Sequence, residues 1–401
     1  MSSTSPFSTA LPADVGLDAS RLDRLRLILQ SEIDRARLPG AVALIGRRGK
    51  LALFEALGQQ DPAGGTPMAR DSLFRIYSMT KPIVSVAVMM LLERGRLLLS
   101  DPVSKYLPEY TAQQLAVEHH GSLELQPVTS GATVQDLLRH TAGLTYEFLG
   151  MSAVQRQYAA ARIGSRTRDT TEFSRALAAL PLMAQPGTVW EYSRATDVLG
   201  RLVEVLGGQP LGEFLHEQIF VPLGMLETGF WVPPKHHGRI AEPFARDPEG
   251  GLTTALFDPR QQPQMESGGG GLVSTAMDYA RFLQFMLNKG ELGGVRLLGP
   301  RIVDWMTADH LGAIPVNPRS GSAALLTPGN GFGLGFAVRT AAGLSAVPGS
   351  VGSYFWGGIA GTTFFVDPAE DLFALMMIQA PNQRELYRPL FRDLVYAALI
   401  D

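Results

Sequence analysis

Residues 78–92 read Ser78-Met79-Thr80-Lys81-Pro82-Ile83-Val84-Ser85-Val86-Ala87-Val88-Met89-Met90-Leu91-Leu92, so that one serine and one lysine open a long apolar segment. Desolvating an ammonium beside such a segment is costly unless the group loses its proton or finds partners. A lysine whose pKa is lowered serves as a general base, and it activates a serine on the same helical face. The stretch therefore predicts a serine hydrolase site.

The spacing of these residues places the serine at the N-terminus of a helix. Positions three apart share one helical face, which brings Ser78 and Lys81 together. Pro82 has no N–H and fits best within the first turn. Free N–H groups and the positive end of the helix dipole lie there, and both favour an attacking serine and an oxyanion. Taken alone, the pattern also fits a serine that only caps the helix and a lysine that extends to water.

Two later motifs supply candidate partners for this pair. Tyr192-Ser193 holds a tyrosine that, beside a lysine, can share its proton and then protonate a leaving group. Trp356-Gly357-Gly358-Ile359 ends a predicted strand, and its two glycines let a substrate approach a main-chain N–H. By itself each motif also has a structural explanation, namely a tyrosine anchored in a loop and a sheet edge or bulge.

Composition and missing motifs exclude several classes of protein. The 401 residues carry a formal net charge of −3 with no basic stripe, so nucleic acid is not an expected partner. The chain has no cysteine, which excludes disulfides, thiolate metal sites and cysteine nucleophiles. No Gly-x-Ser-x-Gly or His-Glu-x-x-His occurs, which argues against an alpha/beta-hydrolase and a zinc protease.

Neither the N-terminal residues nor the apolar run after Lys81 indicates a membrane protein. Residues 1–6 lack the basic and apolar regions of a signal peptide. The apolar run at residues 83–92 is far short of the roughly 20 residues that cross a bilayer. We therefore expect a cytoplasmic protein with no membrane partner, and the sequence carries no signal for an oligomeric state.

The pattern of elements predicts an α+β fold. Asp18 caps an amphipathic helix that is followed by a hairpin of strands at residues 41–45 and 51–57. Helices joined by long loops fill residues 100–290, two of them starting at Thr133 and Thr275. Strands return at residues 332–339, 353–356, 362–366 and 372–378, before a last helix at residues 383–399.

Strands at both ends of the chain predict one antiparallel sheet, flanked by helices and built from both termini. We expect residues 1–85 and 290–401 to form this mixed domain and residues 86–289 to form an inserted, mostly helical domain. The active site would lie in the cleft between the two.

The order Ser-x-x-Lys, Tyr-Ser, Trp-Gly-Gly resembles the serine beta-lactamase and penicillin-binding-protein superfamily. The sequence is most similar to the family VIII carboxylesterases, which look like class C beta-lactamases, and the resemblance extends over most of the chain. Supporting segments are residues 137–144, 192–200 and 364–367.

The resemblance implies roles for individual residues. Ser78 would be the nucleophile, with Lys81 and Tyr192 as general base and acid. The backbone N–H groups of Ser78 and Ile359 would form the oxyanion hole, and no cofactor or metal would be required. The residues implied to contact substrate are Trp356, Gly357, Gly358 and Tyr146.

Two departures from class C beta-lactamases bear on the substrate. Arg194 replaces the asparagine of Tyr-x-Asn, and Trp356 stands where Lys-Thr-Gly would supply the lysine that holds a beta-lactam carboxylate. Because an indole carries no charge, small uncharged esters of short to medium chain fit better, although Arg194 offers a compensating charge. The alternatives are a beta-lactamase or D-Ala-D-Ala peptidase, an acyltransferase with the same triad, and a non-catalytic binding protein.

Overall fold

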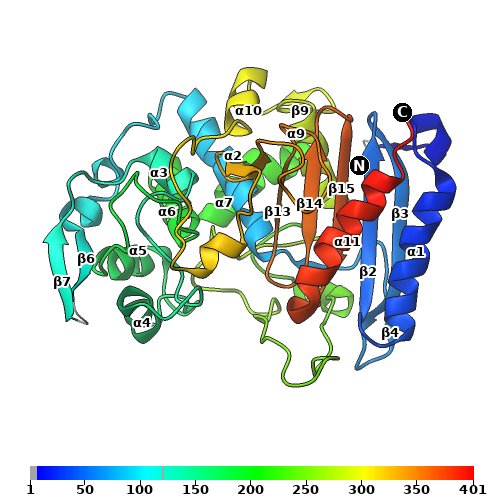
Figure 1. Cartoon of the computed structure of the whole chain (residues 1–401), viewed down its shortest axis with the longest axis horizontal. Coiled ribbons are helices and arrows are strands. Elements are labelled where there is room, and N and C mark those ends of the chain that lie inside the picture. The colour runs from blue at the N-terminus through cyan, green and yellow to red at the C-terminus, as the bar shows by residue number, and fades with distance from the viewer. Residues whose placement is uncertain (1–6, 120–121) are drawn as a thin grey trace.

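The computed structural model describes residues 7–119 and 122–401, so the N-terminal segment considered above lies outside the described residues. A mixed sheet runs through the right-hand half of the molecule in Figure 1, in the order β1-β3-β2-β15-β14-β13-β12-β11, with β4 beside β3. These strands are β1 (Ser8–Thr9), β2 (Gly40–Arg47), β3 (Lys50–Asp61), β4 (Thr66–Pro67), β11 (Asn330–Phe332), β12 (Ala337–Arg339), β13 (Tyr354–Gly357), β14 (Thr363–Asp367) and β15 (Leu372–Ile378).

The sheet joins both ends of the chain, as the sequence predicts. The β2–β3 hairpin turns between Arg47 and Lys50. Strand β2 also pairs antiparallel with β15, along the whole length of β15. Every residue of β2 and of β15 is buried, because helices cover both faces. The short β1 is an exception to the predicted antiparallel pattern, since it runs parallel to β3.

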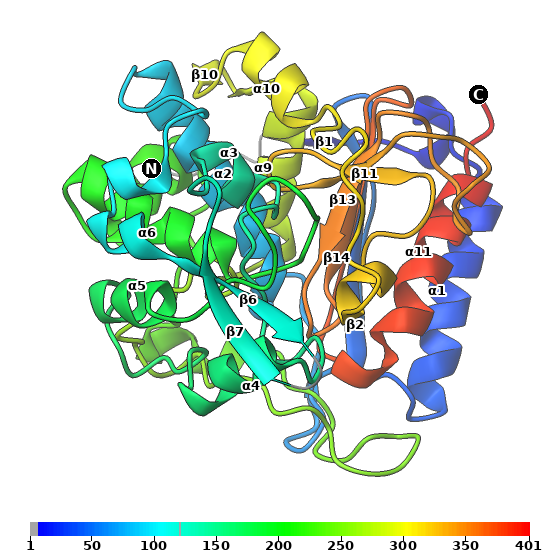
Figure 2. The same ribbon diagram turned by 60° about the vertical axis from the view of Figure 1, so that its left-hand side comes forward.

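Helices α1 (Ala19–Asp34) and α11 (Arg384–Ala397) lie side by side on one face of the sheet (Figures 1 and 2). Asp18 caps α1 by accepting from the N–H of Arg21, as predicted. Leu22, Leu25 and Leu29 form the buried stripe of α1, with a period of three to four residues. The opposite face of the sheet is covered by α9 (Ala276–Leu287), which packs on β14, β15 and β2.

The apolar segment at residues 78–92 forms α2 (Thr80–Glu93) at the centre of the molecule. A 3₁₀ turn, Tyr77–Met79, precedes it, so Ser78 lies just before the α-helix. Residues 80–91 are all buried, because residues of the sheet and of the other helices both pack on this helix. An apolar helix without a polar face requires such a central position.

The remaining helices gather in the left-hand half of Figure 1. Thr133 caps α3 with a complete capping box, whereas Asp278 of α9 bonds Glu227 and Thr228 instead of returning to its own cap. The other elements are α3 (Val134–Leu138), α4 (Ala153–Ala160), α5 (Thr170–Ala178), α6 (Ala195–Gly207), α7 (Leu211–Leu215), α8 (Val221–Leu223), β5 (Phe74–Arg75), β8 (Val273–Ser274), β9 (Glu291–Leu292), β10 (Val295–Arg296) and α10 (Pro300–Met306).

Two details of the sequence-based prediction are wrong. The strand predicted at residues 332–339 is a hairpin of β11 and β12, because Gly335 turns the chain with a φ of 100°. The stretch predicted as helices and loops also contains a hairpin of β6 (Gln114–His119) and β7 (Ser122–Pro127).

The division into domains at residues 86 and 289 stays a prediction. No helix in the described part of the chain is long and apolar enough to span a bilayer.

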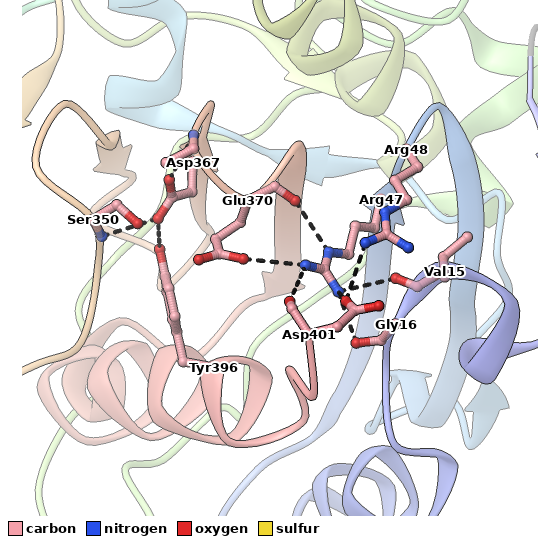
Figure 3. A network of polar contacts seen from close by, with 10 residues as sticks. Val15, Gly16, Arg47, Arg48, Ser350, Asp367, Glu370, Tyr396 and Asp401 are labelled. Carbon is pink, nitrogen blue, oxygen red and sulfur yellow. Dashed lines mark hydrogen bonds and ion pairs between the residues drawn. The ribbon is translucent and has the colours of Figure 1, made fainter.

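A buried arginine ties both ends of the chain to the sheet (Figure 3). The Arg47 guanidinium donates to the carbonyls of Val15 and Gly16 at 3.0 and 2.7 Å, and to the carbonyl of Glu370 at 3.0 Å. It also pairs with the carboxylates of Glu370 at 3.1 Å and Asp401 at 2.8 Å. One side chain thus satisfies acceptors from three segments that are distant in sequence.

Replacing this arginine should weaken the fold. We expect Arg47→Met to lower the free energy of unfolding by about 2–3 kcal/mol, because buried carbonyls lose their donor. Arg48→Met is the matched control, since the exposed Arg48 side chain pairs with Asp401 and such surface pairs contribute about 0–1 kcal/mol. Urea unfolding measures both, and equal midpoints for the two variants would contradict the expectation.

Candidate active site

Ser78 lies in the tight 3₁₀ turn that leads into α2. Tyr77 before it has a φ of 43°, in the left-handed region that a bulky residue rarely adopts. The Tyr77 side chain is held in place, because its hydroxyl accepts from the N–H of Phe257 at 3.0 Å and its ring meets the Phe257 ring edge-on. Backbone strain of this kind persists only where the surroundings impose it, and it is concentrated at functional sites.

Lys81 is completely buried and reaches three oxygen atoms. Its Nζ lies 3.2 Å from Ser78 Oγ, 3.0 Å from the hydroxyl of Tyr146 and 2.6 Å from the carbonyl oxygen of Gly269. The pKa of Lys81 is lowered to about 7, because burial lowers it more than the Asp197 carboxylate raises it, and the Arg194 charge adds to the lowering. The sequence predicts a lysine that desolvation brings close to neutrality, and the structure places it beside the predicted serine.

Tyr192 packs over the same amine. Its ring centroid lies 4.5 Å from Lys81 Nζ, and its hydroxyl accepts from Trp356 Nε1 at 3.1 Å. Burial raises the pKa of Tyr192, while hydrogen bonds with Ser78 and Trp356 partly offset this. The geometry brings Ser78, Lys81, Tyr192 and Trp356 together from the start of α2, the loop before α6, and β13.

The two glycines after Trp356 have packing reasons that the sequence did not reveal. A Cβ on Gly358 would lie 2.4 Å from the carbonyl oxygen of Ile76, and one on Gly357 would lie 2.8 Å from the guanidinium carbon of Arg388. Gly358 thus lets the end of β13 approach the backbone two residues before Ser78. Within residues 7–119 and 122–401, the N–H groups of Ser78 and Ile359 have no acceptor. Their contact to substrate stays a prediction.

Three residues around the lysine were not predicted in these places. Tyr146, expected only to line the pocket, bonds Lys81 directly. Asp197 accepts from the N–H of Gly269 at 2.9 Å and from Ser267 Oγ at 2.5 Å, which fixes the loop whose carbonyl binds Lys81. The sequence of residues 267–271 indicates a flexible loop near the cleft, and only the tertiary contacts show that the Gly269 carbonyl binds Lys81.

The charge of Arg194 is already engaged. Its guanidinium pairs with the carboxylates of Glu147 and Asp197 and stacks over the Tyr146 ring. The suggestion that Arg194 offers a compensating charge to a substrate therefore lacks support, because two carboxylates neutralise this buried arginine.

Comparison with known proteins agrees with this arrangement. The family described as Beta-lactamase matches residues 25–397. The chain belongs to the beta-lactamase family. Esterase EstB of Burkholderia gladioli is 34% identical over 99% of this chain and all of its own length, and the lovastatin esterase of Penicillium rubens is 29% identical over 88% of this chain and 91% of its own. The structure of EstCE1, a hydrolase with promiscuous acyltransferase activity, superimposes with a TM-score of 0.77 at 29% identity, covering 94% of this chain and 98% of that one.

The predicted recognition and fold are thus confirmed. The chain is a serine hydrolase with the beta-lactamase-like fold, and its match to EstB places it with the esterases of this family. This excludes the interpretation as a non-catalytic binding protein.

The lowered pKa of Lys81 predicts how activity depends on pH. If the neutral amine is the active form, kcat/KM should fall below about pH 7 as Lys81 gains its proton. Asp197→Asn removes the charge that favours the ammonium, so the acidic limb should move to lower pH. The measurement is a pH profile of ester hydrolysis.

Glu147→Gln serves as the control for this substitution. It also removes a carboxylate from Arg194, but Glu147 is not among the charges that shift Lys81. We expect its profile to stay close to that of the native protein. An acidic limb that moves to higher pH in Asp197→Asn would contradict the assignment.

Proposed function

We propose that the protein hydrolyses small uncharged carboxylic esters, of short to medium chain, through an acyl-enzyme on Ser78. The observation that carries this proposal is the set of three oxygens around Lys81 Nζ. A neutral amine has two N–H groups and one lone pair. The N–H groups suit the Gly269 carbonyl and the Tyr146 hydroxyl, which leaves the lone pair for the Ser78 proton.

The first step is attack of Ser78 Oγ on the ester carbonyl. Its proton passes to the Lys81/Tyr192 pair, and the carbonyl oxygen becomes an oxyanion. The free N–H groups of Ser78 and Ile359 are the proposed donors to it, and one such donor typically contributes about 3 kcal/mol. Collapse of the tetrahedral intermediate expels the alkoxide, which takes the proton back from the same pair.

The second step reverses the roles. Water attacks the acyl carbonyl and gives a proton to the Lys81/Tyr192 pair, and Ser78 leaves with that proton as the acid product departs. Tyr192 is suited to relay protons, because its hydroxyl accepts from Trp356 and its ring lies over the Lys81 amine. Its raised pKa keeps it protonated between turnovers.

Two residues near the site favour esters over beta-lactams. Trp356 holds the position where beta-lactamases carry a lysine, and its indole N–H is used by Tyr192. Arg194 is neutralised by two carboxylates. Neither residue offers a free charge to a substrate carboxylate, so we propose weak turnover of cephalosporins.

The nucleophile is tested by hydrolysis of p-nitrophenyl acetate, butyrate and octanoate beside a chromogenic cephalosporin. We expect Ser78→Ala to lose ester turnover by about 10⁴-fold or more, since residues of a catalytic unit fail together. The native protein should cleave the cephalosporin only weakly. Retained turnover in Ser78→Ala would refute the proposed nucleophile, and strong cephalosporin cleavage would favour a beta-lactamase.

The general base is tested by Lys81→Met, which keeps the length of the side chain without its amine. We expect the rate of acylation to fall by about 10²–10⁴-fold, the usual contribution of a positioned base. The burst of p-nitrophenolate in stopped flow measures this rate. Lys105→Met, at an exposed lysine paired with Asp101, is the control and should act like the native protein. Near-native acylation in Lys81→Met would contradict the mechanism.

Acyl transfer is the second candidate, favoured by the likeness to EstCE1, whose description includes promiscuous acyltransferase activity. The same acyl-enzyme serves both reactions, and the acceptor decides between them. Adding a primary alcohol during hydrolysis of p-nitrophenyl butyrate separates the two, by the ratio of butyrate ester to butyrate in the products.

A further inference from the structure

One partly buried cation near the site has no role in the mechanism so far. Arg388 extends from α11 toward the end of β13, and its guanidinium donates to the carbonyl oxygens of Gly358 and Thr362, the latter at 3.4 Å. Its Nε is buried without a partner in the described chain, and Arg388 forms no ion pair with an Asp or Glu there. Burial lowers the pKa of Arg388 to about 10, which reflects the cost of holding a charge in this position.

The carbonyl that Arg388 binds belongs to a particular peptide unit. The C=O of Gly358 and the N–H of Ile359 are two ends of the same planar group. In a trans peptide they point in opposite directions, and no cis peptide occurs among the described residues. A donor that holds the oxygen therefore also sets the direction of the N–H. This N–H, like that of Ser78, has no acceptor among the described residues, and it is the proposed oxyanion donor.

The backbone around this peptide supplies one donor to the Gly358 carbonyl, the N–H of Gly361, and Arg388 adds a second donor to the same oxygen. Two glycines precede Ile359, and glycine restricts its backbone least of all residues. The turn is closed by two backbone bonds of 2.9 Å, from Gly358 N–H to the Thr362 carbonyl and from Gly361 N–H to the Gly358 carbonyl. Arg388 bridges both of these carbonyls. The absence of a side chain on Gly357 provides the space for its guanidinium.

We infer that Arg388 is a positioning residue, which orients and polarises the Gly358–Ile359 peptide so that its N–H stabilises the oxyanion. The inference rests on the proposed function. A cation on the carbonyl draws charge from the peptide, and hydrogen bonds in such a chain strengthen one another. The effect is greatest when negative charge develops on the substrate, so Arg388 acts on the transition state more than on the bound ester.

The test compares two arginines of one helix, the partly buried Arg388 and the buried Arg392. Arg388→Met should lower kcat by about 10–100-fold, a part of the about 10²–10³-fold that removal of a whole oxyanion donor costs. KM should stay within about twofold, because the ground-state ester gains little from the hole. Arg392→Met is the matched control: Arg392 lies one turn further along α11 and donates to the Pro348 carbonyl at 2.7 Å and to Ser353 Oγ at 3.2 Å.

The control variant should lose thermal stability and keep kcat. The pH profile of Arg388→Met should keep its acidic limb, because the effect is on the oxyanion and leaves Lys81 unchanged. If Arg388→Met and Arg392→Met lose the same stability and neither loses kcat, Arg388 is only structural and the inference fails. Retained turnover in Ser78→Ala would instead overturn the proposed function, so the two failures are distinguishable.

A second variant tests the same idea without touching the arginine. Gly357→Ala places a methyl group where the Arg388 guanidinium lies, and it should move that group away from the Gly358 carbonyl. We expect a similar loss of kcat with KM little changed. In the double variant Gly357→Ala with Arg388→Met, the two losses should be less than multiplicative, because both break one contact. Fully multiplicative losses would contradict a shared contact.

Discussion

The burial of the Lys81 amine is the constraint on which the rest of the site depends. An amine in an apolar interior is tolerated when it is neutral or when its hydrogen bonds are satisfied, and the structure provides for both. To bury it, the chain must place an apolar helix between a sheet and a helical region. To satisfy it, the chain must bring Tyr146 and the Gly269 carbonyl to one point. The same two requirements keep a lone pair directed at Ser78.

The charges around Lys81 also affect its protonation. Arg194 and Asp197 form a buried pair close to Lys81, and their charges shift its pKa in opposite directions. Asp197 also holds the Gly269 loop, so one carboxylate both adjusts the charge of the amine and positions its acceptor. Burying such a pair is unfavourable by itself, and its retention here agrees with a role in the chemistry.

On the side of the sheet, close packing likewise positions the backbone at the site. Gly358 lies against the carbonyl of Ile76, which brings the end of β13 to the turn that carries Ser78. Arg388 reaches the same peptide from α11, the last helix of the chain. The end of the sequence thus contributes to a site whose nucleophile lies in its first quarter, because β15 and α11 pack against the N-terminal hairpin and α1.

Local patterns in the sequence were sufficient to predict much of this. The apolar run, the caps at Asp18 and Thr133, and the alternating strands near the end predicted α1, α2, α3 and the antiparallel core of the sheet. The Ser78–Lys81 spacing predicted their contact, since three residues make almost one helical turn. The motifs of Tyr192 and Trp356 were candidates from the residues themselves, and the resemblance implied their roles. The structure brings Tyr192 to the lysine and Trp356 to Tyr192.

Only the tertiary structure decided the rest, because it depends on contacts between residues that are 30 to 188 positions apart. The Gly269 carbonyl, the Asp197 bond that holds it and the Arg388 guanidinium behind Gly358 have no local signature. A backbone carbonyl is the same in every residue, and a glycine-rich stretch reads as a flexible linker until its neighbours are known. The sequence by itself determined which groups are the candidates for the reaction; their packing decided which partners surround them and in which direction their pKa values shift.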